Sequence, residues 1–346
     1  MARLTSPVRR PIEPRCGRSN GLPVRFPASR SSITWSPSAS PPVSRRNVTG
    51  QAAWRRVRRP DGGELEVLSE DSADQPLVFH WGTPGAAVWF EPLATAAAHA
   101  GLRFVTYSRP GYAGSTPRPG RSVADAAADV AAILDALGAD TFVTLGWSGG
   151  GPHAVACAAL LPDRCAAAAS LAGVAPYGGE GLDWLAGMGP ENIEEFSAAV
   201  EGESALNAAV LKMAGELKTV QGADVAAALG GLVSDVDKRA LTGEFADILA
   251  ESFRRSVSTG VAGWRDDDLA FTRSWGFDLG SIRRPVAVWQ GGQDRMVPFA
   301  HGQWLAAHIP SARVHLYPDE GHLSLGVASL DRIVADLARL GSEARV

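Results

Sequence analysis

The chain has 346 residues, 45% of them hydrophobic and 20% charged, a composition typical of a globular protein with a sizeable core. Its formal charge at pH 7 is −4, but residues 1–50 contain nine Arg and one acid, so they carry +8 and the remainder carries −12. The acidic body argues against nucleic acid as a partner. No run reaches the ~18 apolar residues that a membrane span needs, so we expect no membrane association.

Residues 1–50 are rich in Arg, Ser and Pro and show neither a helical nor a strand period, so we expect a disordered extension. Their acid-poor composition also resembles a transit peptide, which is the alternative interpretation. The three cysteines (Cys16, Cys157 and Cys165) are too few for a disulfide framework. We therefore expect a cytoplasmic protein.

Structural periodicity begins at Trp54. Two alternating runs, 54–59 and 64–68, flank Pro60-Asp61-Gly62-Gly63 and predict a β-hairpin. Strands are then expected at 76–81, 102–107, 141–145 and 166–171, with helices between them at 89–100, 123–137 and 153–161. The alternation resumes with strand 285–290, helix 300–309, strand 313–317 and helix 327–340. This order predicts an α/β fold with a doubly wound, mostly parallel sheet.

Residues 174–276 interrupt the alternation, because they are helical by pattern. Candidate helices there are 191–201, 205–217, 223–233 and 242–256. We interpret this segment as an inserted helical cap, or lid, over the carboxyl ends of the strands, with a separate helical domain as the alternative. The α/β core then consists of residues 51–173 and 277–346.

A glycine-rich turn joins strand 141–145 to helix 153–161. It reads Gly146-Trp147-Ser148-Gly149-Gly150, with the pattern G-x-S-x-G between a strand and a helix. Such a turn forces the serine towards an unfavourable φ and needs small neighbours, and it holds the hydroxyl clear of the backbone near the helix N-terminus. Ser148 is therefore the candidate nucleophile.

A serine nucleophile needs a base and an acid that orients the base. Among seven histidines, only His322 lies on a Gly-flanked turn directly after a late strand. Asp294 follows strand 285–290 in a Gly-rich loop, and the order Ser148, Asp294, His322 fits strand ends of a doubly wound sheet. The rival acids, Asp266-Asp267-Asp268, belong to the cap segment, where we expect a solvated or helix-capping run.

These motifs resemble the α/β-hydrolase family over roughly residues 54–343. The resemblance is carried by Trp81-Gly82-Thr83-Pro84-Gly85, Ser108-Arg109-Pro110-Gly111-Tyr112-Ala113-Gly114-Ser115, Gly146-Trp147-Ser148-Gly149-Gly150, Gly291-Gly292-Gln293-Asp294-Arg295-Met296-Val297-Pro298 and Gly321-His322. Two positions depart from the family pattern: Trp81 stands where His is usual, and Ser108 where Asp is frequent.

The resemblance implies that Ser148 is the nucleophile, His322 the general base and Asp294 its orienting acid. The oxyanion hole would be formed by the backbone N–H groups of Gly149 and Thr83. We expect Trp81, Trp147 and His80 to line the substrate pocket. The chemistry needs no cofactor, and the sequence contains no phosphate-binding loop, dinucleotide fingerprint or zinc-ligand spacing.

The expected activity is hydrolysis of an ester or related acyl bond in a small, fairly apolar molecule. A proline-iminopeptidase-like aminopeptidase would instead need an acidic clamp for a substrate amine. Glu191, Glu194, Glu195 and the aspartates at 266–268 are candidates for that clamp. A cofactor-free perhydrolase and a non-catalytic small-molecule receptor would also be compatible with the same fold.

Overall fold

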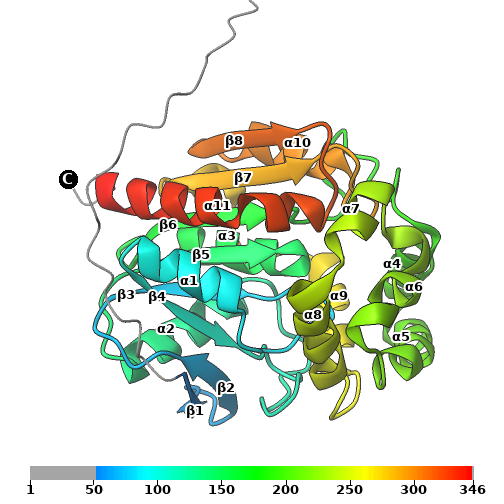
Figure 1. Cartoon of the computed structure of the whole chain (residues 1–346), viewed down its shortest axis with the longest axis horizontal. Coiled ribbons are helices and arrows are strands. Elements are labelled where there is room, and N and C mark those ends of the chain that lie inside the picture. Colours follow the sequence, from blue (N-terminus) through cyan, green and yellow to red (C-terminus); the bar gives the residue numbers. More distant parts are fainter. Residues whose placement is uncertain (1–51, 345–346) are drawn as a thin grey trace, which may run out of the picture. The chain divides into compact units, whose positions relative to one another are not determined.

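The computed structural model describes residues 52–344, which contain one eight-stranded sheet in the order β1-β2-β4-β3-β5-β6-β7-β8 (Figure 1). The strands are β1 (Ala53–Arg58), β2 (Glu64–Ser69), β3 (Gln75–His80), β4 (Leu102–Tyr107), β5 (Phe142–Trp147), β6 (Cys165–Leu171), β7 (Val286–Gly291) and β8 (Ala312–Tyr317). The pairs β1–β2 and β2–β4 are antiparallel and all others are parallel, which confirms the predicted sheet. The predicted extension, 1–50, lies outside the described residues.

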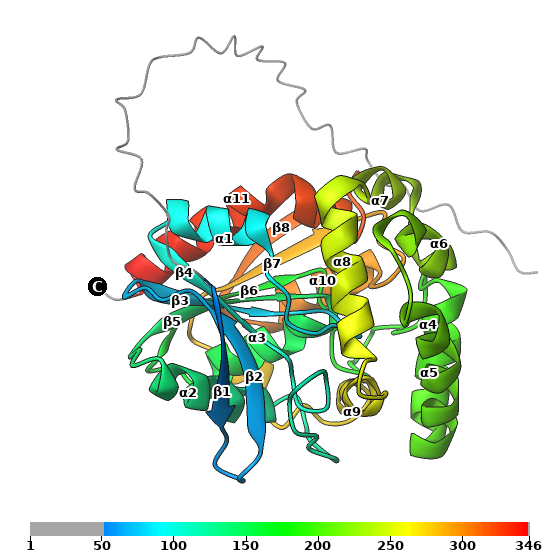
Figure 2. The ribbon, with the colours of Figure 1, turned by 60° about the horizontal axis from the view of Figure 1, so that its bottom comes forward.

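Helices cover both faces of this sheet. Helices α1 (Glu91–His99) and α11 (Ser324–Glu343) lie side by side on one face, and α2 (Asp125–Ala136), α3 (Gly151–Leu160) and α10 (Phe299–His308) lie on the other (Figure 2). Every residue of β4, β5, β6 and β7 is consequently buried. Burial on both faces explains why these strands read as continuous apolar runs in the sequence.

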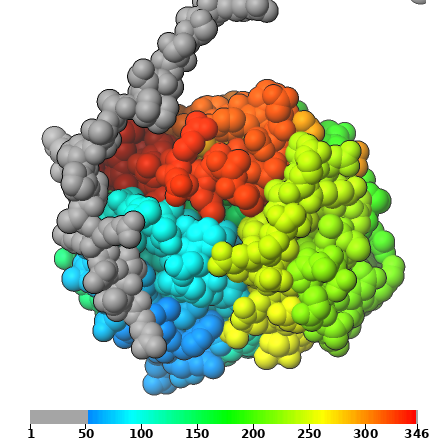
Figure 3. Space-filling view, in the orientation of Figure 1, coloured from blue at the N-terminus to red at the C-terminus, as the bar shows by residue number. Residues whose placement is uncertain are grey.

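The helices between β6 and β7 form the cap, which lies at the carboxyl ends of the parallel strands (Figure 1). They are α4 (Pro190–Glu201), α5 (Glu203–Leu217), α6 (Val225–Ala228), α7 (Asp235–Ala240), α8 (Gly243–Ser256) and α9 (Ala262–Phe271). In the space-filling view, the yellow and green surface of the cap adjoins the cyan surface of α1 and the red surface of α11 (Figure 3). Within residues 52–344, no helix is long and apolar enough to span a membrane.

The cap differs from its prediction in two ways. The helix expected at 223–233 is reduced to α6, because Gly230 has a positive φ of 53° and a 3₁₀ turn at Gly230–Leu232 ends the segment. Helices α7 and α9 were not predicted. Helix α9 contains three consecutive aspartates, which interrupt the apolar periodicity of a helix. Its sequence therefore does not indicate that the helix is buried.

The sheet order creates a crevice at the ends of β3 and β5. From β3 the chain moves to β4 on one side, whereas β5 pairs with β3 on the other side. In open α/β sheets, ligands bind at such a switch point, outside the carboxyl ends of the strands. The loop after β3 and the turn after β5 therefore face the same crevice.

Candidate active site

Ser148 lies on a strained turn between β5 and α3. Its φ is +56°, a left-handed conformation that a residue with a side chain adopts at a cost. The chain can pass because the flanking glycines lack side chains: a Cβ at Gly146 would collide with the carbonyl oxygen of Gly150, and a Cβ at Gly150 would collide with that of His80. The G-x-S-x-G spacing is therefore a packing requirement of this turn.

The loop after β3 packs directly against Ser148. A Cβ at Gly82 would lie 3.3 Å from the Cβ of Ser148, and a Cβ at Gly149 would lie 3.1 Å from the backbone nitrogen of Thr83. The backbones of Thr83 and Gly149, predicted to form the oxyanion hole, thus meet beside the Ser148 side chain. Backbone N–H groups that point at the same oxygen can hold it when it becomes negative during a reaction.

His322 follows β8 and its ring contacts Asp294. The Nδ1–H of His322 donates to Oδ2 of Asp294 over 2.8 Å, which leaves Nε2 of the neutral ring as an acceptor. Asp294 is fixed in turn, because its Oδ1 accepts the backbone N–H groups of Met296 and Val297, each over 2.8 Å. The amide of Gln290, fully buried in β7, donates a further hydrogen bond of 2.9 Å to Oδ2.

The electrostatics of this pair favour a proton on His322. Burial lowers the pKa of His322, but the charge and hydrogen bond of Asp294 outweigh it and raise the pKa above its ordinary value. Burial also raises the pKa of Asp294, and the His322 ring opposes that change. An imidazole with a raised pKa beside a carboxyl group is well suited to accept a proton from a hydroxyl.

Ser148 and His322 line one cavity of about 350 Å³ between the sheet and the cap. The predicted residues Trp81, Thr83 and Trp147 line it as well. His80 does not: it is fully buried outside the cavity lining, and its Nδ1 lies 3.2 Å from the hydroxyl of Tyr107. The expectation that His80 lines the pocket is therefore wrong, because its ring packs against Tyr107 of β4 and Cys157 of α3, away from the crevice.

A cap residue holds the turn that carries His322. Asp237 of α7 is fully buried, and its carboxylate accepts the backbone N–H groups of His322, Leu323 and Ser324 over 2.7–3.2 Å. Leu323 and Ser324 are the N-cap and the first residue of α11, whose first N–H groups have no partner within the helix, and His322 directly precedes them. Sequence reasoning missed Asp237. A capping box with Ser234 was readable from the spacing, but the contact with the distant His322 turn was not.

A second cap residue organises the loop after β3. Asp267 of α9 is fully buried and accepts hydrogen bonds from Arg109, Tyr112 and the hydroxyl of Thr83. Arg109 also donates to the carbonyl oxygens of Trp81 and Gly82, over 2.5 and 2.7 Å. The cap is thereby tied to the loop beside Ser148.

The expectation that Asp266-Asp267-Asp268 is a solvated or capping run is wrong, since all three side chains are buried. Burial alone would raise the pKa of Asp267, but Arg109 and Arg121 outweigh it and hold the pKa well below its usual range. A charged carboxylate is tolerated in this interior only because two guanidinium groups surround it. In the part of the chain that the structure describes, no group of three or more His, Cys, Asp or Glu could hold a metal ion.

Comparison with known proteins finds relatives that are named as esterases and hydrolases. A pimeloyl-[acyl-carrier protein] methyl ester esterase of Aromatoleum aromaticum is 29% identical over 254 residues, covering 72% of this chain and 90% of the relative. A 2-hydroxy-6-oxononadienedioate/2-hydroxy-6-oxononatrienedioate hydrolase of Dechloromonas aromatica is 27% identical, covering 80% of this chain and 91% of the relative.

Among solved structures, the bromoperoxidase of Bacillus anthracis aligns with a TM-score of 0.61 and 20% identity, over 84% of this chain and 100% of that chain. At this identity the likeness concerns the fold alone. The sequence profile of the α/β-hydrolase fold matches residues 75–328, which is well over half of the protein. The chain therefore belongs to the α/β-hydrolase fold family.

Proposed function

We propose that this protein is a serine hydrolase that cleaves an ester or related acyl bond through Ser148, His322 and Asp294. The observation that carries the proposal is the shared cavity: a serine on a strained turn and a histidine bonded to a buried aspartate line the same space. Relatives named as an esterase and a hydrolase support hydrolytic chemistry.

The proposed reaction begins when Nε2 of His322 takes the proton of the Ser148 hydroxyl, while the oxygen attacks the substrate carbonyl. The backbone N–H groups of Thr83 and Gly149 would hold the oxyanion, and one such donor contributes on the order of 3 kcal/mol to the transition state. His322 then protonates the leaving alcohol. In the second half, His322 takes a proton from water, the hydroxide formed attacks the acyl carbonyl, and His322 returns the proton to the Ser148 oxygen as the acid leaves.

The substrate is expected to differ from the dioates in the names of several relatives. A second carboxylate would need a cationic partner, yet among residues 52–344 no Arg lines the cavity, and the lysine that does, Lys212, lies 3.3 Å from the carboxylate of Glu194. We therefore infer an acyl substrate without a free carboxylate.

A fluorophosphonate probe tests the serine chemistry. We expect stoichiometric labelling of the native protein and no labelling of Ser148→Ala. The native protein should hydrolyse p-nitrophenyl heptanoate, and Ser148→Ala should not. An unlabelled native protein that still binds small esters would favour a non-catalytic receptor and would contradict the proposal. Equal hydrolysis by Ser148→Ala would exclude Ser148 as the nucleophile.

A further inference from the structure

The cap half of the cavity is unusually acidic. Four glutamates (Glu191, Glu194, Glu195 and Glu216) line it, and all four come from α4 and α5. The lysine of the lining is mostly exposed and already paired with Glu194. Apolar side chains, among them Leu229, Leu249 and Met296, line the same cavity. The cavity thus combines a reactive end at Ser148, apolar lining residues and an acidic end formed by α4 and α5.

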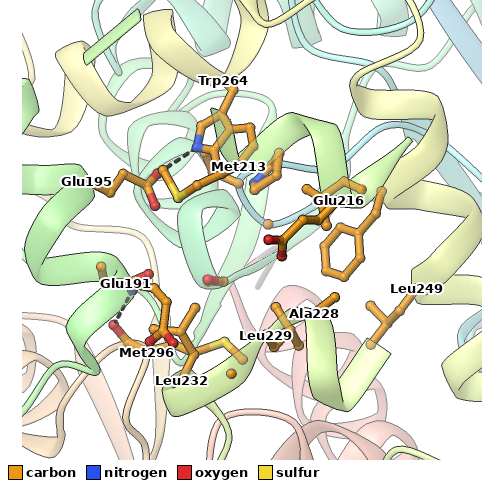
Figure 4. Close-up of a pocket in the computed structure, with 18 of the residues that line it drawn as sticks. Glu191, Glu195, Met213, Glu216, Ala228, Leu229, Leu232, Leu249, Trp264 and Met296 are labelled. Carbon is orange, nitrogen blue, oxygen red and sulfur yellow. Dashed lines mark hydrogen bonds between the residues drawn. The ribbon is translucent and has the colours of Figure 1, made fainter. Parts of the chain in front are cut away.

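Glu195 differs from the other glutamates because it is only 7% exposed. Its Oε1 accepts the indole N–H of Trp264 over 2.5 Å. Figure 4 shows the carboxyl groups of Glu195 and Glu216 pointing into the cavity from opposite sides. The negative charge of a buried carboxylate with a single neutral hydrogen-bond donor is poorly stabilised, since buried charges normally have a charged partner.

Asp268 is a second buried carboxyl group close to Glu195. It is fully buried, its charge interacts with that of Glu195, and neither of its oxygens receives a hydrogen bond from a donor among residues 52–344. Two nearby carboxyl groups disfavour each other's charged form. Burial and the charge of Glu195 raise the pKa of Asp268 well above its ordinary value. Apart from the indole N–H of Trp264, these two carboxyl groups accept no hydrogen bond from an N–H group and form no ion pair with a cationic side chain among residues 52–344.

We infer that the acidic end of the cavity, built on Glu195 and Glu216, binds a protonated amine of the substrate. An ammonium group supplies a positive charge and further N–H donors to these carboxyl groups. This inference rests on the proposed function, and names its substrate class: an acyl compound with a short apolar segment between the scissile carbonyl and a cationic amine.

A series of three p-nitrophenyl esters of equal length tests the inference on the full chain. They are the 6-aminohexanoate, the heptanoate and the hydrogen pimelate, which end in an ammonium, a methyl and a carboxylate group. We expect kcat/KM to be about ten- to a hundredfold higher for the ammonium ester than for the heptanoate, and lowest for the carboxylate ester. Equal values, or a preference for the carboxylate, would overturn the inference.

Variants identify the carboxyl group responsible. Glu195→Gln keeps an acceptor for Trp264 but removes the charge, so the ratio of kcat/KM between the ammonium ester and the heptanoate should fall by about tenfold or more. The matched control is Glu201→Gln on the same helix, which is exposed and outside the cavity lining, and should leave this ratio unchanged. An unchanged ratio in Glu195→Gln would reject Glu195 as the binding group.

A binding measurement separates this inference from the proposed function. Calorimetry of Ser148→Ala with n-hexylammonium, hexan-1-ol and hexanoate needs no turnover. Tighter binding of the ammonium than of the alcohol or the carboxylate supports the acidic subsite even if no ester is hydrolysed. If the native protein hydrolyses p-nitrophenyl heptanoate but Ser148→Ala does not bind n-hexylammonium, the proposed serine hydrolase activity is supported and the proposed amine-binding subsite is contradicted.

Discussion

The Ser148 turn can form only if the residue at position 146 has no side-chain atoms. Its left-handed φ and the close approach of the neighbouring backbones leave no room for a methyl group at Gly146. By contrast, Gly215 in α5 has open space around it and a helical conformation, so a side chain there should be tolerated. The two glycines therefore form a matched pair for measuring the packing demand of the turn.

We expect Gly146→Ala to lower the free energy of unfolding by about 1–3 kcal/mol, because the new methyl group overlaps the carbonyl oxygen of Gly150. The control Gly215→Ala should raise it by about 0.5–1 kcal/mol, since alanine favours a helix. Urea denaturation measures both changes. Equal effects at the two sites would show that the turn does not restrict the chain as the structure indicates.

The pH dependence of activity follows from His322. Under the proposed mechanism the ring must be neutral to accept a proton, so kcat/KM should fall as the pH drops through a pKa raised above the ordinary value of 6.5. In Asp294→Asn, burial still lowers the pKa of His322 while the carboxylate that raised it is gone. We expect the acid limb of the pH profile, where kcat/KM falls with decreasing pH, to move to lower pH. We also expect kcat to fall on the order of 10³- to 10⁴-fold.

Stopped-flow or steady-state rates from pH 5 to 9 with p-nitrophenyl heptanoate measure both effects. An acid limb that stays in place in Asp294→Asn would contradict the assignment of this limb to the His322–Asp294 pair.

Helix α7 shows how a short element acts on a distant turn. Its Asp237 satisfies three backbone N–H groups at the start of α11, and its charge contributes to the raised pKa of His322. A six-residue helix has little stability of its own. It is retained here through its tertiary contacts, which fix the turn that carries His322.

We expect Asp237→Ala to lower the free energy of unfolding by about 1–3 kcal/mol, because it leaves buried N–H groups without acceptors. The acid limb of kcat/KM should also move to lower pH, which a purely structural role would not cause. The control is Asp235→Ala on the same helix, whose side chain is 86% exposed. A lower stability with an unmoved limb would reject the effect of Asp237 on His322.

At the scale of the whole molecule, the cap and the core behave as one body. Residues 52–344 belong to a single compact unit, and Asp267 of α9 connects the cap to Arg109 and to the loop after β3. Breaking a buried ion pair by removing one partner leaves uncompensated charge in the interior. The stability of the core should therefore depend on a residue of the cap.

We expect Asp267→Asn to lower the free energy of unfolding by about 3–5 kcal/mol at pH 7, compared with no clear change for the exposed Asp183→Asn. The pKa of Asp267 is depressed, so its contribution is fully present above about pH 4 and is lost as the pH falls further. The difference between native protein and variant should thus shrink in acid. Unfolding of the native protein followed by tryptophan fluorescence and by circular dichroism should give coincident transitions.

The sequence by itself determined the sheet, the glycine turn and the order of Ser148, Asp294 and His322. These depend on local signals: period, turn chemistry, and glycines that no other residue can replace. The same signals placed three cap helices within a few residues of their bounds.

Only the tertiary structure decided the partners of the buried acids. Asp237, Asp267 and Asp268 lie on two helices that periodicity missed, and in the sequence they are indistinguishable from solvated aspartates. Burial and pairing are set by residues such as Arg109, 158 positions away from Asp267. Electrostatic interactions act through space, so the sequence shows that a charge is present but not which charge it will face.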